Sequence, residues 1–156
     1  MKKTWIQKLE ANDLPKVVEL DENGQKKFNG AKTMLVPSPK DVYDIMQNVP
    51  YGRIITVAEI RVILSKKFGT DTTCPLTSGI FIWIAANASV EIAEKEAKKP
   101  NMPFWRTTKS KGELVEKYPG GIENQKEMLE NEGIKVIQKG KKTFIENFEL
   151  YVENIV

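Results

Sequence analysis

Histidine is absent from this sequence of 156 residues, and cysteine occurs once, at Cys74. Without histidine the chain cannot form Ser-His or Cys-His nucleophilic pairs, histidine general bases or histidine-ligated metal sites. A single cysteine excludes an intrachain disulfide and a thiolate zinc cluster. The sequence also lacks a glycine-rich phosphate-binding loop of the usual spacing. We therefore expect no metal ion and no cofactor.

Arginine is scarce, because Arg53, Arg61 and Arg106 are the only three among 24 basic residues. The formal net charge is +3, which does not by itself indicate a nucleic-acid partner. Few arginines also limit the bidentate contacts by which proteins read bases. Lysines can still bind phosphates as point charges, so the composition leaves DNA open as a partner.

Long apolar runs are missing as well, so we expect no membrane span. The opening residues, MKKTWIQKLE, interrupt their apolar positions with charges and do not resemble a secretory signal. These two observations favour a cytoplasmic protein. The length suits one domain with a hydrophobic core.

Residues 1–37 show no sustained periodicity and are predicted to form an N-terminal arm packed on the rest of the chain. Trp5 is the expected anchor of this arm, and short strands are expected near residues 17–20 and 34–36. The main domain is predicted to span residues 38–156.

Helix signals are clear from residue 38 onward. Ser38 and Pro39 predict an N-cap and a first helical position. Thr56 and Glu59 have the spacing of a capping box, and the helix that they begin is expected to end at Gly69. A further helix, residues 76–87, is apolar on nearly every side and must be largely buried.

These last two helices, joined by a short turn, predict a helix-turn-helix arrangement. Thr72 or Thr73 is expected to cap the second helix, whose first turns carry the small residues Thr77, Ser78 and Gly79. Residues 88–99 are rich in charge and alanine and predict a separate solvated helix.

Two apolar segments, residues 134–137 and 143–145, flank a basic turn and predict a β hairpin. Its lysines, Lys139, Lys141 and Lys142 among them, suit either phosphate contacts or a soluble sheet edge, and both interpretations remain open. A short closing helix is expected over residues 148–156. The predicted fold class is mostly α with a small β hairpin, a winged-helix-like domain.

The stretch between the helices and the hairpin suggests a pocket. Phe104 and Trp105 precede Arg106, and a Tyr118-Pro119-Gly120-Gly121 loop precedes a helix over residues 122–132. The glycines suit a backbone that approaches a ligand closely, and the helix N-terminus would present free N–H groups. An aromatic core plug, a tight turn and an ordinary amphipathic helix explain the same residues, and the spacing alone favours this structural interpretation over a pocket.

At this point the order of motifs resembles the DNA-binding domain of the methylated-DNA–protein-cysteine methyltransferases, over roughly residues 38–133. The similar motifs are Val49-Pro50-Tyr51-Gly52, Ile55-Thr56, Pro103-x-x-Arg106, Tyr118-x-Gly120-Gly121 and Leu129-x-x-Glu132-Gly133. The resemblance implies a winged-helix-like fold that enters the DNA minor groove and accepts a flipped guanine in a pocket. It also implies a structural role for Glu132.

Two departures from the family pattern change the expected chemistry. Phe104 and Trp105 stand at the positions of the acceptor cysteine and its histidine, so this block cannot accept an alkyl group. The chain in this respect resembles the alkyltransferase-like proteins, which bind alkylated guanine without repairing it. Pro75 stands where the family carries an arginine that fills the gap left by the flipped base, and base flipping favours such a wedge.

The expected function is therefore that of a non-enzymatic DNA-binding protein of the alkyltransferase-like kind, sensing alkylated guanine for DNA repair. Its partners would be double-stranded DNA and a repair protein. One alternative is an interaction or structural module that kept the fold and lost DNA; another is an alkyltransferase that uses Cys74. The expected base pocket comprises Phe104, Trp105, Arg106, Tyr118, Pro119, Gly120 and Gly121, and the expected DNA contacts are Thr56, Thr77, Ser78, Gly79, Lys139, Lys141 and Lys142.

Overall fold

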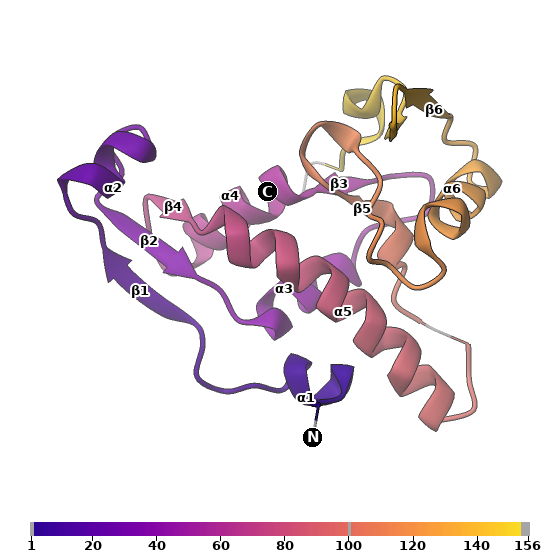
Figure 1. Ribbon diagram of the computed structural model, residues 1–156, viewed down its shortest axis with the longest axis horizontal. Helices are drawn as coiled ribbons and strands as arrows, with labels where there is room; N and C mark the ends of the chain where they lie inside the picture. Colours follow the sequence, from indigo (N-terminus) through magenta and orange to yellow (C-terminus); the bar gives the residue numbers. More distant parts are fainter. Residues whose placement is uncertain (1, 100, 154–156) are drawn as a thin grey trace.

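The computed structural model describes residues 2–99 and 101–153. One long helix, α5 (Pro75–Lys95), runs diagonally through the molecule and carries most of the other elements on its sides (Figure 1). Helices α3 (Pro39–Met46) and α4 (Val57–Phe68) pack against α5. The fold is thus built around the helix that the sequence predicts to be buried.

Local sequence signals set the ends of α3 and α4 as predicted. The Ser38 hydroxyl accepts a hydrogen bond from the Asp41 N–H, and the Asp41 carboxylate accepts one from the Ser38 N–H. Thr56 and Glu59 form the equivalent capping box of α4. Gly69 ends α4 with a φ of 70°, the left-handed conformation that glycine adopts without strain.

The largest apolar cluster lies among α3, α4 and α5. Its members from α4, namely Val57, Ile60 and Leu64, lie on one face of that helix. Helix α5 contributes the small residues Ala85 and Ala86, which let neighbouring elements approach closely. The fully enclosed side chains include Leu35, Val42, Met46, Ile55, Ile60, Leu64 and Ile82.

The turn between α4 and α5 contains a short strand, β4 (Thr72–Thr73). The prediction that Thr72 or Thr73 caps α5 is wrong. Cys74 is the N-cap, and its side chain makes no capping hydrogen bond. The threonines pair instead with β2 (Thr33–Val36), where Leu35 lies opposite Thr73 in parallel register. A contact with a distant segment therefore outweighs the local preference for a cap.

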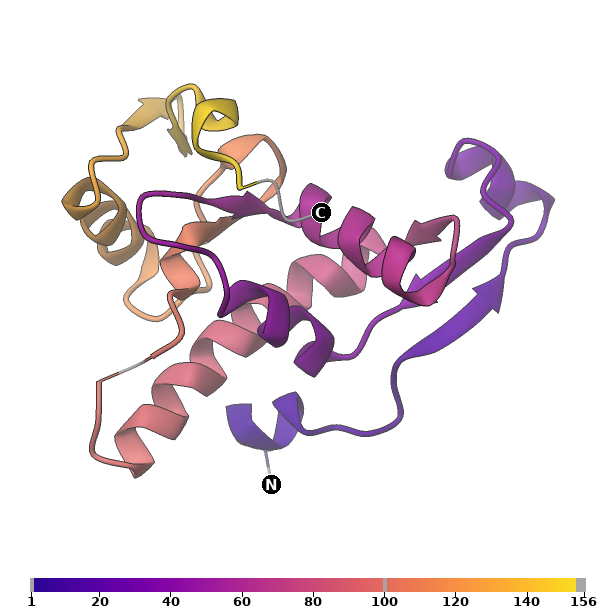
Figure 2. The ribbon, with the colours of Figure 1, turned by 180° about the vertical axis from the view of Figure 1, so that it is seen from behind.

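The N-terminal segment consists of α1 (Trp5–Leu9), β1 (Lys16–Glu19), α2 (Glu22–Lys27) and β2. Strands β1, β2 and β4 form a three-stranded sheet in that order, which joins this segment to the helix-turn-helix. The Trp5 ring lies 5.9 Å from the Trp83 ring in an edge-to-face arrangement. Helix α1 thus packs on α5 while the sheet extends along the other end (Figures 1 and 2).

The separate charged helix predicted over residues 88–99 does not form. Helix α5 continues without a break to Lys95, and Ala88, Ser89 and Ala93 in this part of it are buried. Among the residues that the structure describes, α5 is also long and apolar enough to cross a membrane by length and composition. The expectation that long apolar runs are missing therefore fails here, and half of that apolar window is buried inside the protein.

The C-terminal third adds a second, smaller apolar cluster. After the 3₁₀ turn η1 (Phe104–Arg106), strand β5 (Thr107–Thr108) pairs in parallel with β3 (Ile55–Thr56). A further 3₁₀ turn, η2 (Ser110–Gly112), and helix α6 (Gly121–Asn131) follow, and the antiparallel strands β6 (Val136–Lys139) and β7 (Lys142–Ile145) form the predicted hairpin.

The closing helix expected over residues 148–156 appears as a 3₁₀ turn, η3 (Phe148–Tyr151), and residues 154–156 lie outside the described part. The predicted fold class is confirmed: the protein is mostly helical, with small sheets, a helix-turn-helix and a C-terminal β hairpin.

Candidate nucleic-acid interface

The aromatic residues of the expected base pocket are in mutual contact. The Phe104 ring lies 5.4 Å from the Trp105 ring and 5.4 Å from the Tyr118 ring, in edge-to-face geometry both times. Phe104 and Tyr118 are each 3% exposed. The Phe104 ring is therefore buried in contact with both of the other rings.

Tyr118 is fixed at its polar end as well. Its hydroxyl donates a hydrogen bond of 2.8 Å to the Thr107 carbonyl oxygen, which also accepts from Gln125 Nε2. Burial raises the pKa of Tyr118 well above its ordinary value. The phenol thus stays neutral and acts as a donor at physiological pH.

Glu132 joins three segments at the edge of these rings. Its carboxylate accepts hydrogen bonds from Trp105 Nε1 at 2.6 Å, from Arg106 Nε at 3.0 Å and from the Gly52 N–H at 2.8 Å. Arg106 in turn donates through Nη1 to the Val49 carbonyl oxygen. These bonds tie the end of α6 to η1 and to the turn before β3, a structural role.

The glycines of the Tyr118–Gly121 loop both adopt left-handed backbone conformations, with φ of 78° at Gly120 and 71° at Gly121. A Cβ added to Gly120 would lie 2.5 Å from the Asn124 Cβ, whereas one added to Gly121 would meet nothing within 4 Å. The close approach that the sequence suggests is therefore made at Gly120 by the protein's own Asn124. Pro119 contributes its carbonyl oxygen, which accepts from Asn124 Nδ2.

The start of α5 combines exposed and enclosed side chains. Leu76 is 72% exposed and Pro75 is exposed beside it, while Thr77 and Gly79 are half-buried. Ser78 is fully buried, and its hydroxyl donates to the Cys74 carbonyl oxygen. The Thr77 hydroxyl is buried without a hydrogen-bond partner among the described residues.

Two of the expected DNA contacts are therefore corrected. The Thr56 side chain is 1% exposed and caps α4, and the Ser78 side chain is enclosed in the core side of α5. Neither hydroxyl can reach a duplex. A Ser or Thr side chain near a helix start can turn inward to hydrogen-bond the nearby backbone. From the sequence alone, such a residue cannot be distinguished from one that faces a DNA groove.

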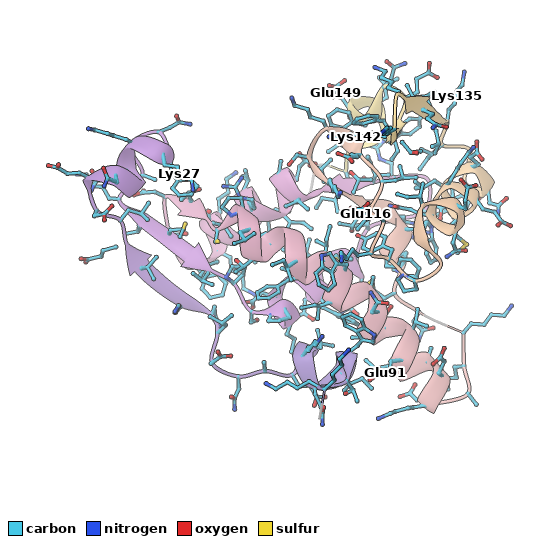
Figure 3. All side chains as sticks on the ribbon, in the orientation of Figure 1. Lys27, Glu91, Glu116, Lys135, Lys142 and Glu149 are labelled. Carbon is cyan, nitrogen blue, oxygen red and sulfur yellow. The ribbon has the colours of Figure 1, made fainter. Side chains whose placement is uncertain are left out.

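The lysines of the hairpin are exposed at its turn, where Lys139 pairs with Lys142 across the two-residue loop. The Lys142 ammonium lies 3.9 Å from the Glu113 carboxylate. Figure 3 shows Lys142 and Lys135 at the same end of the molecule as Glu149, so this end carries mixed charge. Figures 1 and 2 place the hairpin well away from β4 and the beginning of α5.

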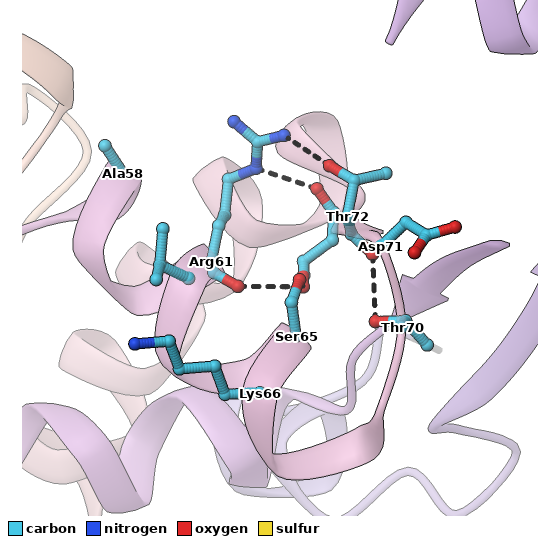
Figure 4. A pocket seen from close by; sticks show the side chains of 9 residues that line it. Ala58, Arg61, Ser65, Lys66, Thr70, Asp71 and Thr72 are labelled. Atoms are coloured by element: carbon cyan, nitrogen blue, oxygen red, sulfur yellow. Dashed lines mark hydrogen bonds between the residues drawn. The ribbon is translucent and has the colours of Figure 1, made fainter. Parts of the chain in front are cut away.

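A pocket that the sequence analysis missed lies between α4 and the following turn. We call it the α4 pocket; its volume is about 440 Å³, and it is lined by Ala58, Arg61, Val62, Ser65, Lys66, Thr70, Asp71, Thr72 and Thr73 (Figure 4). Arg61 donates through Nε to the Thr73 carbonyl oxygen at 2.7 Å and through Nη2 to the Thr72 hydroxyl at 3.3 Å.

The signal for this pocket was present in the sequence. Positions 58, 61, 62, 65 and 66 share one face of α4 at helical spacing, opposite the buried face that contains Ile60 and Leu64. That outer face carries two cations and no carboxylate of its own. The spacing of residues on α4 does not predict the position of β4, whose residues Thr72 and Thr73 form the other side of the pocket.

The elements together define a helix-turn-helix protein with a C-terminal β hairpin, in which the first turn of α5 is exposed at Pro75 and Leu76. No protein-family model and no curated protein matches the chain. Two solved structures are similar to it: Atl1 of S. pombe in complex with damaged DNA containing O6-carboxymethylguanine, and ATL of S. pombe in complex with DNA. Each is 22% identical with a TM-score of 0.45, and each match covers 74% of this chain and 94% of that chain.

Proposed function

We propose that this chain is a non-enzymatic protein that binds double-stranded DNA through the helix-turn-helix of α4 and α5. The observation that carries the proposal is the exposure of Pro75 and Leu76, at 72% for Leu76, in the first turn of the second helix. In helix-turn-helix proteins this is the part that enters a groove.

The local shape suits entry into a groove. A Cβ added to Gly79 would meet no atom within 4 Å, so the surface beside the first turns of α5 is open. A large apolar side chain such as Leu76, exposed at the beginning of a helix, is of the type that architectural proteins insert between base steps. The exposed hairpin lysines would add phosphate contacts beyond this central region.

The chemistry of the ring cluster supports the non-enzymatic part of this proposal. Phe104 has no nucleophilic atom, and the chain has no histidine that could activate one. The single thiol, on Cys74, sits at the N-cap of α5, where its own N–H donates to the Leu35 carbonyl oxygen. The sequence has no imidazole that could take its proton.

The finer part of the proposal is a preference for alkylated guanine. Trp105 and Arg106 are half-buried at the edge of the ring cluster, where an extruded base would find a stacking surface and a cation. Acceptance of the base requires displacement of the Phe104 ring in addition to the few kcal/mol, roughly, that flipping costs. We therefore expect a modest lesion preference.

The test measures binding to duplexes with and without 6-O-methylguanine at two salt concentrations, for the wild type and for Leu76→Glu. A carboxylate at the proposed groove contact should weaken binding to both duplexes. Leu150→Glu is the matched control, because Leu150 is 70% exposed on η3. If Leu76→Glu and Leu150→Glu weaken duplex binding equally, the proposal that α5 enters a groove is wrong.

The remaining outcomes separate the alternatives. Steeply salt-dependent binding without lesion preference would leave a general DNA-binding protein. No binding of either duplex at low salt would leave the interaction module. A mass gain of one methyl group on Cys74 after incubation with the lesion duplex would contradict the non-enzymatic assignment.

A further inference from the structure

The α4 pocket is an open, cation-bearing site next to the proposed groove contact, and no contact described so far uses it. We propose that it binds the phosphodiester backbone of the duplex, with Arg61 and Lys66 contacting successive phosphates of one strand. This inference rests on the proposed function and deepens it, since the first helix of a helix-turn-helix crosses the DNA backbone.

The Arg61 guanidinium is oriented by the protein and still has donors to offer. Nε and Nη2 are bound to Thr73 and Thr72, and Nη1 has no hydrogen-bond partner within residues 2–99 and 101–153. Figure 4 shows the free end of the guanidinium turned away from these two bonds. A side chain that is already ordered loses less conformational entropy when it binds a ligand.

Charge in the α4 pocket favours an anion. Asp71 is its only carboxylate, and it accepts hydrogen bonds from the backbone N–H groups of Lys32 and Thr33 at 2.9 Å and 3.2 Å. These bonds lower the pKa of Asp71 and direct its negative charge towards the edge of β2. Burial lowers the pKa of Arg61, with the Cys74 side chain opposing, and arginine nevertheless remains protonated at neutral pH.

The spacing of the two cations favours a chain of phosphates over a single ion. Arg61 and Lys66 are five residues apart on α4, which separates their Cα atoms by about 7.5 Å along the helix axis. Figure 4 shows the two side chains on different sides of the pocket. On α4 the lining between them is small or apolar, with Val62 55% exposed, so a strand meets no bulky or acidic side chain of this helix.

The experiment compares Lys66→Gln, Arg61→Gln and the control Lys67→Gln by fluorescence anisotropy with an unmodified duplex over a series of salt concentrations. Lys67 loses the same charge from the adjacent position, but it lines a different pocket beside Asp41 and Asp44. We expect Lys66→Gln and Arg61→Gln each to reduce the slope of log K against log salt by about 1. Lys67→Gln should keep the wild-type slope.

Thermal unfolding accompanies each measurement. Lys66 makes no hydrogen bond or ion pair in the described part of the chain, so Lys66→Gln should unfold like the wild type and its effect belongs to binding. Arg61→Gln also loses two hydrogen bonds to β4. If Arg61→Gln unfolds at a lower temperature than the wild type, the result for Lys66→Gln alone decides the inference. A second arm measures thermal unfolding of the wild type and of Lys66→Gln with inorganic phosphate, and a third measures the binding of poly-glutamate by the same two proteins.

Each result has one meaning. Duplex binding by the wild type with unchanged slopes in both pocket variants overturns the pocket assignment and leaves the proposed function intact. No duplex binding by the wild type overturns both. Stabilisation by inorganic phosphate that Lys66→Gln abolishes, without a change in duplex affinity, overturns the assignment in favour of a small-anion site. Binding of poly-glutamate that depends on Lys66, with duplex affinity unchanged, overturns it in favour of an acidic polypeptide.

Discussion

At the scale of single residues, the Glu132 carboxylate is the most connected polar group around the ring cluster. Its partners come from positions 52, 105 and 106, and its side chain is 5% exposed against 14% for Arg106. Removing one member of a buried ion pair leaves the other charge without compensation. The stability of this region therefore depends on Glu132 more than on any surface ion pair described above.

Glu132→Gln should lower the free energy of unfolding by about 3 kcal/mol, because the amide group presents a donor to Trp105 and Arg106 and leaves the guanidinium uncompensated. Glu153→Gln is the matched substitution, since Glu153 pairs with Arg53 at side-chain exposures of 31% and 41%. It should cost at most about 1 kcal/mol. Urea denaturation measures both, and equal losses would contradict the role assigned to Glu132.

Tyr118 gives the protein a specific sensitivity to alkaline pH. Its pKa in the folded state lies well above the unfolded value of 10.0 because of burial. The stability that the neutral phenol provides is complete below pH 10.0 and falls as the pH rises towards the folded pKa, because the unfolded chain ionises first. Tyr118→Phe lacks this dependence.

Tyr118→Phe should be about 1 kcal/mol less stable than the wild type near neutral pH, where it loses one hydrogen bond to Thr107. The deficit should shrink and then reverse as the pH passes 10.0. Parallel urea denaturation of the two proteins over this range measures the difference. A deficit that stays constant with pH would show that Tyr118 titrates alike in the folded and unfolded chains.

At the scale of elements, local signals predicted what local contacts determine. The caps at Ser38 and Thr56 and the stop at Gly69 follow from hydrogen bonds within four residues, and the structure has all of them. Strand β4 could not be predicted in this way, because Thr72 and Thr73 become a strand only when residues 33–36 lie beside them. The α4 pocket could not be predicted for the same reason, because Thr72 and Thr73 of β4 form part of its lining.

The loop before α6 offers a test of an element boundary. Gly120→Ala and Gly121→Ala each place an alanine in a left-handed conformation, which costs roughly 1–2 kcal/mol. Gly120→Ala should lose a further amount of about 1–3 kcal/mol, because its Cβ would overlap the Asn124 Cβ. Thermal and urea unfolding of the two variants give the comparison, and equal destabilisation would mean that Asn124 moves aside freely.

At the scale of the whole molecule, the N-terminal arm is expected to depend on the helical core, and the core on it. Leu35 is fully buried in the main apolar cluster, and β2 closes one side of the helix-turn-helix. The sequence suggested an arm at this position, but its periodicity is too weak to show which strand it would pair with. Likewise the order of motifs along the sequence identified Phe104, Trp105 and Tyr118 as neighbours. It could not predict that Phe104 packs edge to face against the other two rings.

Deletion of residues 1–37 should cost at least about 5 kcal/mol, from the loss of Leu35 and of the strand that pairs with β4. Deletion of residues 1–13 is the control, because it removes α1 and the Trp5–Trp83 contact and leaves the sheet in place. Circular dichroism during heating should show a folded, less stable protein for the short deletion and little or no cooperative unfolding for the long one. Similar transitions for both deletions would make the arm an independent appendage.

Trp105 has one further property. Its ring packs against both apolar clusters, while the other two tryptophans, Trp5 in α1 and Trp83 in α5, contact each other edge to face. Intrinsic fluorescence of the double variant Trp5→Phe/Trp83→Phe would therefore isolate Trp105 as an emitter at the junction between the two apolar clusters. A spectral change of that emitter on addition of DNA would record whether the junction opens when the helices engage their ligand.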